Sequence, residues 1–148
     1  MAEQFIRPEF VESAPAQLED GVLYISDRFH TALHKCCCGC GREVVTPLNP
    51  AGWRYIREGK AITLKPSIGN WSFPCKSHYL IIRNRIVWAA TMSPQEIAFV
   101  KARDARDQAV YLARSNEAKL RGDGRHAEPT LWSWIISLTA AVRRWWSS

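Results

Sequence analysis

The sequence predicts an α+β fold in which a small, mostly antiparallel β core is followed by two C-terminal helices. Three observations indicate this class. Residues 21–92 contain short runs of β-branched and aromatic residues separated by Gly, Pro and Asn, which is typical of short strands joined by turns. A helix-start signal lies at 93–96. The last twenty residues carry no charge except Arg143 and Arg144, which favours a packed helix.

Length and composition set the outer limits of the fold. The chain has 148 residues, of which 47% are hydrophobic and 23% charged, as in ordinary globular proteins. Long disorder, collagen and a multi-helix membrane protein are therefore excluded. The length predicts one domain. We expect the chain to consist of an acidic N-terminal arm at 1–20, a β core at 21–92 and a helical extension at 93–148.

The net charge of +6 is concentrated in the β core. Residues 1–20 contain five acidic residues and one basic residue, whereas residues 21–92 contain ten basic and three acidic residues. Such a surface would attract an acidic protein partner or an anionic lipid surface, or it would simply be solvated. Because the Lys and Arg residues are scattered, we expect no nucleic-acid partner.

Short strands are predicted in order along the core. Residues 1–20 form an arm or an edge strand. The next candidates are 21–29, a short strand beginning at Thr31, and 43–46, after which two prolines break the chain. Two hairpins follow, with a loop between them at 66–75: 53–57 pairs with 61–65, and 77–82 pairs with 85–89 across Arg83-Asn84.

The first predicted helix has a clear beginning. Ser93 suits the N-cap, Pro94 the first turn, and Glu96 the reciprocal position of a capping box. We expect the helix to run to about Leu120 and to end at the glycines that follow. Its apolar stripe is thin, so most of its surface should be exposed.

The second predicted helix covers 129–146. From Pro129 to Val142 there are fourteen uncharged residues, fewer than the roughly 20 needed to span a bilayer. We expect this helix to dock on the sheet or on another copy of the chain. Contact with a membrane interface is the alternative, because its four tryptophans and two arginines suit that environment.

The cysteines are unusually crowded. Cys36, Cys37, Cys38 and Cys40 lie within five positions, and Cys75 stands apart. Residues 1–20 are acidic and lack the apolar run of a secretory signal, so we expect a cytoplasmic protein with reduced thiols. Neighbouring cysteines are also poorly placed for disulfides with one another. A metal site is the predicted role of this cluster.

Zinc is the predicted metal, because it prefers four tetrahedral thiolate or imidazole ligands. In an extended run, Cys36, Cys38 and Cys40 would point one way and Cys37 the other, and Cys75 would complete the site. Such a structural zinc would staple the β core, since metal-binding energy becomes folding energy. A catalytic or redox thiol, an iron–sulfur cluster and inert buried cysteines are the alternatives.

A serine and a histidine form a candidate hydrolytic pair. Ser67 lies at a predicted strand end before a glycine, and His78 begins a strand eleven residues later. A serine nucleophile needs such a base within hydrogen-bond reach. Asn70 could orient the imidazole or bind an oxyanion. In the alternative interpretation, Ser67 caps a turn, Asn70 adopts a left-handed conformation, and His78 is structural or a metal ligand.

Several of these motifs occur together in one bacterial family. The segments HKCCCGCGREVVTPLNPAGW, ITLKPSIGNWSFPCKSHYLI and IVW resemble a family encoded in bacterial ubiquitination-like operons, beside ubiquitin-like proteins and diverged activating and conjugating enzymes. The resemblance covers about residues 30–90. The matching positions are His34, Cys36, Cys38, Gly39, Cys40, Gly41, Trp53, Pro66–Trp71, Pro74–Tyr79, Val87 and Trp88.

This resemblance implies a zinc-containing peptidase that trims a bacterial ubiquitin-like protein or releases it from its conjugates. Ser67 would attack the carbonyl, and His78 would take and return the proton. One alternative is a non-catalytic zinc-binding adaptor for a protein or nucleic acid. Another makes the metal catalytic, with His78 as a ligand and an open position for water.

Overall fold

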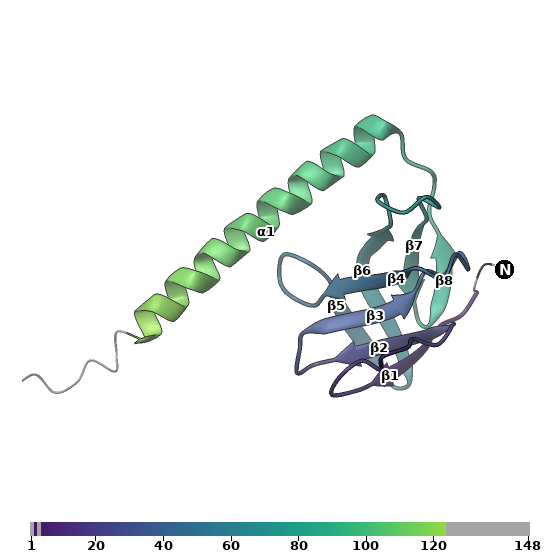
Figure 1. The fold of residues 1–148 in the computed structure, drawn as a ribbon, viewed down its shortest axis with the longest axis horizontal. Coiled ribbons are helices and arrows are strands. Elements are labelled where there is room, and N and C mark those ends of the chain that lie inside the picture. Colours follow the sequence, from purple (N-terminus) through teal and green to yellow (C-terminus); the bar gives the residue numbers. More distant parts are fainter. Residues whose placement is uncertain (1, 3, 124–148) are drawn as a thin grey trace, which may run out of the picture. The chain divides into compact units, whose positions relative to one another are not determined.

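The computed structural model describes residue 2 and residues 4–123 (Figure 1). The chain divides into two compact units, Met1–Ala109 and Val110–Ser148, and the second is described only by the end of a helix. The elements are β1 Arg7–Phe10, β2 Val22–Ser26, β3 Thr31–Lys35, β4 Glu43–Pro47, β5 Arg54–Glu58, β6 Ala61–Gly69, β7 His78–Ile82, β8 Arg85–Trp88 and α1 Pro94–Asp123.

The strands form two four-stranded sheets, with the orders β1-β2-β3-β4 and β5-β6-β7-β8 (Figure 1). All neighbours are antiparallel except β1 and β2, which run parallel. The mostly antiparallel core is therefore confirmed. The N-terminal segment contributes an edge strand, one of the two structures expected for it.

Both sheets contribute to one buried core. Ile25 and Leu23 from β2 pack in the same apolar cluster as Leu64 from β6 and Ile81 from β7. Cys36 and Cys37 belong to this cluster and are almost inaccessible to solvent. The cysteine segment therefore begins at the centre of the domain rather than in a peripheral loop.

The prediction of a loop at 66–75 is wrong in its first part, because β6 continues to Gly69. Ile68 and Gly69 pair with Tyr79 and His78 of β7. An irregularity between Leu64 and Ile68 accommodates the proline, which cannot donate to a ladder hydrogen bond. Such bulges re-aim side chains and are common beside active sites.

The β7–β8 turn is the two-residue type predicted from Arg83-Asn84. Both residues have positive φ, 49° and 65°, as a type I′ hairpin turn requires. The Asn84 side chain also accepts a hydrogen bond from the Ile62 backbone N–H at 2.8 Å and donates to the Lys60 carbonyl at 3.2 Å. This asparagine therefore connects the turns of the two predicted hairpins.

The predicted start of α1 is confirmed. The backbone N–H of Ser93 donates to the Glu96 carboxylate at 2.8 Å, and the Glu96 N–H donates to Ser93 Oγ at 3.3 Å. The Ser93 N–H and hydroxyl both donate to the Glu96 carboxylate and lower its pKa. Within the described part of the chain, no helix is long and apolar enough to cross a membrane. The second predicted helix, 129–146, lies outside the described residues.

Candidate active site and metal centre

Four of the five cysteines lie in the tight connection between β3 and β4. The prediction of an extended run is wrong here: the chain turns after Cys36, whose carbonyl accepts a hydrogen bond from the Gly39 N–H at 3.0 Å. Gly39 and Gly41 have φ values of 83° and 73°, a left-handed conformation that glycine adopts without a steric penalty. The turn brings Cys36, Cys38 and Cys40 to one side.

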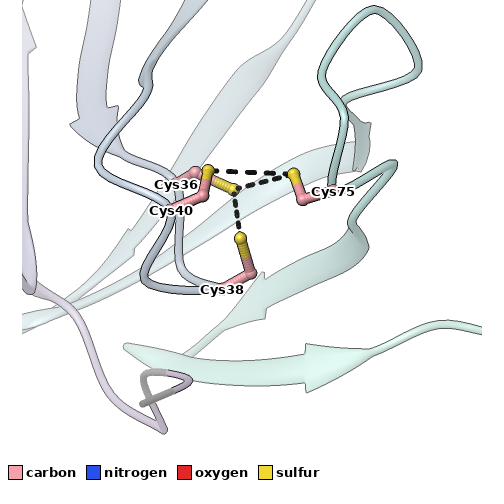
Figure 2. Close-up of side chains that lie close together, drawn as sticks. All are labelled: Cys36, Cys38, Cys40 and Cys75. Carbon is pink, nitrogen blue, oxygen red and sulfur yellow. Dashed lines mark hydrogen bonds between the residues drawn. The ribbon is translucent and has the colours of Figure 1, made fainter.

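Cys75 meets this turn from the connection between β6 and β7 (Figure 2). Its Sγ lies 3.9 Å from that of Cys36 and 3.8 Å from that of Cys40, and the Cys36 and Cys38 sulfurs are 3.4 Å apart. A tetrahedral site with zinc–sulfur bonds of about 2.3 Å has sulfur–sulfur edges of about 3.8 Å. The four thiols, all within 4.8 Å of one another, are therefore spaced to hold a metal ion.

The pKa values of three of these thiols are shifted from that of a free cysteine. Burial raises the pKa of Cys38 to about 12 and raises that of Cys36, so neither ionises readily without a positive charge nearby. At Cys75, burial acts in the same direction but is outweighed by hydrogen bonds from Ser77, and the pKa is lowered to about 7. A bound divalent ion would stabilise all four thiolates.

Polar side chains surround the innermost cysteine. Ser77 Oγ lies 3.1 Å from Cys36 Sγ, and the Asn70 amide nitrogen donates to Ser77 Oγ at 2.9 Å and to Cys36 Sγ at 3.6 Å. Donors of this kind orient metal ligands and stabilise thiolate charge. Sequence reasoning did not assign this role to Ser77, because only the fold places its hydroxyl between two distant cysteines.

The Asn70 amide also contacts a buried pair formed by Tyr79 and His34. Asn70 Nδ2 is 3.4 Å from Tyr79 Oη, which lies 2.8 Å from His34 Nε2. Burial lowers the pKa of His34 to about 4 and raises that of Tyr79. At pH 7 His34 is therefore neutral, and its Nε2 shares a hydrogen bond with the Tyr79 hydroxyl. This places the histidine of the cysteine motif in the core beside the cluster.

Ser67 and His78 meet on the strands β6 and β7. His78 Nε2 lies 3.1 Å from Ser67 Oγ, which is within hydrogen-bond reach. Both side chains are half-buried. The bulge before Ile68 brings the serine into this position, so the pair predicted from two separate motifs is brought together by strand pairing.

The second nitrogen of His78 has a backbone partner. Nδ1 lies 3.2 Å from the carbonyl oxygen of Ala90, just beyond the end of β8. Because a carbonyl only accepts, this contact places the proton on Nδ1 and leaves Nε2 free to accept from Ser67. The Trp71 ring lies against the imidazole, with centroids 4.9 Å apart. No pattern in the sequence indicated Ala90, because every residue type has a backbone carbonyl.

Strand alternation separates the two groups of side chains. Ser77 and Tyr79 are buried and face the cysteines and the core, whereas His78 lies between them and faces the other way. The amide nitrogen of Asn70 is directed to the cysteine side. The role predicted for Asn70, to orient the imidazole or to bind an oxyanion, stays a prediction. Both nitrogens of His78 contact non-metal partners, and His78 is not among the residues grouped around the candidate metal site.

Two cavities meet at Ser67 and His78. One, of about 610 Å³, is lined by Trp53, Gly69, Trp71 and other residues, including part of the N-terminal half of α1. The other, of about 460 Å³, is lined by Arg54, Lys65, Pro66, Ser67, His78, Leu80 and Ala89. A peptide that crosses the Ser67–His78 pair could therefore occupy space on both sides of it.

A family model described as "Bacterial ubiquitination-like system serine protease (BubE)" matches residues 10–89. The chain belongs to the BubE family. The BubE match covers more than half of the chain and includes the five cysteines, Ser67 and His78. It confirms the resemblance to a family of bacterial ubiquitination-like systems. Comparisons with curated proteins and with solved structures give no significant match.

The close approach of Gly69 to Trp71 gives a test of how this BubE-family site is positioned. A Cβ atom at Gly69 would overlap the indole ring of Trp71, which packs on His78. Gly69→Ala is therefore expected to displace the ring and lower kcat/KM by about 10- to 100-fold, since small misplacements are costly in active sites. Cleavage kinetics, measured with the metal content, would check this expectation.

The matched control is Gly59→Ala. A Cβ at Gly59 meets nothing within 4 Å, although its φ of 63° makes the substitution strained. This control is expected to lower stability by about 1 kcal/mol and to leave kcat/KM unchanged. Equal activity losses in the two variants would show that Gly69 acts through stability alone.

Proposed function

We propose that the chain is a serine peptidase that acts at the C-terminus of a bacterial ubiquitin-like protein, either on its precursor or on its conjugates. One observation carries the proposal: a single imidazole contacts Ser67 Oγ at 3.1 Å through Nε2 and the Ala90 carbonyl at 3.2 Å through Nδ1. This is the nucleophile–base–orienter arrangement of serine hydrolases, with a backbone carbonyl in place of the usual carboxylate.

In the proposed reaction, Ser67 Oγ attacks the substrate carbonyl carbon while His78 Nε2 takes the hydroxyl proton. The imidazolium is stabilised by its Nδ1–H hydrogen bond to Ala90. His78 then returns the proton to the leaving amine or alcohol, and an ester to Ser67 remains. Water attacks this ester, gives a proton to His78, and releases the substrate acid as the proton returns to Ser67.

The metal has a structural role in this proposal. Cys36, Cys38, Cys40 and Cys75 would hold zinc, because four thiolates with tetrahedral spacing form a closed site. Zinc would supply folding energy and no open coordination position for water. Since the site needs reduced thiols, we place the protein in the cytoplasm.

The proposal predicts that Ser67 is chemically reactive. In the folded, metal-loaded protein, a fluorophosphonate probe should phosphonylate Ser67 with loss of fluoride, and peptide mass spectrometry would locate the adduct. His78→Gln should slow labelling by about 100-fold or more, because the base is lost. Ser72→Ala is the matched control, since Ser72 is exposed and lines the same larger cavity. It should label at the wild-type rate.

The competing function is a non-catalytic zinc-binding adaptor. It requires no activated serine, so Ser67 would react no faster than Ser72. That result, in protein that retains its metal, would reject the peptidase proposal. Labelling confined to Ser67 and dependent on His78 would reject the adaptor as the whole function.

A further inference from the structure

The smaller cavity beside Ser67 and His78 carries two positive charges. Arg54 on β5 and Lys65 on β6 are direct cross-strand partners, so their side chains lie on the same face of the sheet. Both are exposed and line the cavity of about 460 Å³. Two like charges placed directly opposite each other destabilise a strand pair. The pairing of Arg54 with Lys65 therefore lowers the stability of the fold, which favours a functional reason for the two charges.

Within the described residues, neither cation has an acidic partner. The ion pairs of this part of the chain involve other basic residues, including Arg83, which pairs with Glu58. Asp27 lines a different cavity together with Arg54, but its carboxylate accepts a hydrogen bond from the Tyr55 hydroxyl at 2.9 Å. Within the described residues, Arg54 and Lys65 therefore form no ion pair.

We infer that Arg54 and Lys65 form an anion-binding subsite that recognises a carboxylate of the peptide substrate next to the bond to be cleaved. The inference rests on the proposed peptidase function. Carboxylates are the anionic groups of an unmodified peptide, and guanidinium and ammonium groups bind them by charge-assisted hydrogen bonds. The larger cavity on the other side of the pair is lined by Trp53 and Trp71, and also by Lys101, Arg103 and Asp104 of α1.

The carboxylate has two sources: an acidic side chain near the scissile bond, or the terminal carboxylate of a short C-terminal extension. Both sources present the same carboxylate group, and matched substrates distinguish them. Internally quenched peptides from the C-terminal region of the ubiquitin-like precursor would carry Glu or Gln at each of the two positions on either side of the scissile bond. Each would be made with a free C-terminus and with an amidated one.

Wild-type protein is expected to cleave the best carboxylate-bearing peptide about tenfold faster, in kcat/KM, than its neutral counterpart. Arg54→Gln with Lys65→Gln should remove this preference. Arg54→Glu with Lys65→Glu should reverse it in favour of a Lys-containing peptide. If replacing Gln by Glu raises kcat/KM, the recognised carboxylate is a side chain. If a free C-terminus in place of the amidated one raises kcat/KM, the recognised carboxylate is the terminus.

The matched control removes two other charges from the same hairpin. Arg57→Gln with Lys60→Gln changes the net charge equally, but neither residue lines the cavity. This control should keep the preference. The inference is overturned if wild-type protein does not discriminate, if the Arg54/Lys65 variant still does, or if the control loses the preference too.

Fluorophosphonate labelling of Ser67 separates this inference from the proposed function. If labelling is rapid in wild-type protein and in both Gln variants but charge discrimination is absent, only the subsite is rejected. If Ser67 does not label, the peptidase proposal itself fails, and the subsite inference fails with it.

Discussion

Ser67→Ala is expected to lower the rate of hydrolysis of the ubiquitin-like precursor by about 10⁴-fold or more. Alanine has no oxygen to attack the substrate carbonyl carbon. Comparable substitutions in serine proteases have effects of this size or larger. The loss should appear in kcat rather than in substrate binding. Mass spectrometry of the cleaved C-terminus, followed over time, would measure it.

The same substitution should leave the fold unchanged. Ser67 is half-buried, lies outside the apolar core cluster, and its hydroxyl bonds to His78. Loss of this bond should cost about 1 kcal/mol at most. Metal content and unfolding temperature should therefore stay close to those of Ser72→Ala, the control. Retained cleavage in a folded Ser67→Ala protein would reject the serine mechanism.

Cys75→Ser is expected to remove the metal and to destabilise the domain strongly. Cys75 is the one thiol of the candidate metal site that comes from the β6–β7 connection, and the other three come from the β3–β4 connection of the other sheet (Figure 2). Without Cys75, the proposed metal would no longer join the two sheets. We expect a loss of about 3 kcal/mol or more and a fall in Tm of about 10–20 °C.

Metal stoichiometry, by elemental analysis, and thermal unfolding would be measured together. A chelator should reproduce the effect in wild-type protein, and added zinc should reverse it. Cys37→Ala is the matched control: its side chain is fully buried in the core and lies outside the four-thiol group, so it should lose stability but keep one metal per chain. Full metal content in Cys75→Ser would remove Cys75 from the site, whereas metal loss in Cys37→Ala would extend the site beyond the four thiols.

The predicted strands agree well with the structure where the signal is local. The β7–β8 hairpin follows from Asn84, because asparagine tolerates the positive φ that this turn requires; Arg83 also adopts positive φ there. The start of α1 follows from Ser93 and Glu96, whose side chains satisfy the free N–H groups of the first turn. Both are interactions between residues close in the chain, so they can be predicted without knowing the fold.

The two errors have different causes. Pro66 and Gly69 indicated a loop, but pairing of Ile68 and Gly69 with β7 extends the strand through them, because the partner strand satisfies the backbone. The cysteine run was expected to be extended, but it turns directly after Cys36. Local hydrogen bonds close this turn: the Gly39 N–H donates to the Cys36 carbonyl, and the Cys36 N–H donates to the Arg42 carbonyl.

The sequence by itself determined which groups are present: four thiols suited to one metal, a serine, a histidine, and a basic core that follows an acidic arm. Only the tertiary structure decided how they act together. Side-chain alternation at the start of β7 directs Ser77, the residue before the strand, to the cysteines and His78 to Ser67. The segment after β8 supplies the Ala90 carbonyl. Such contacts depend on register between strands far apart in the chain, which no local pattern of residues encodes.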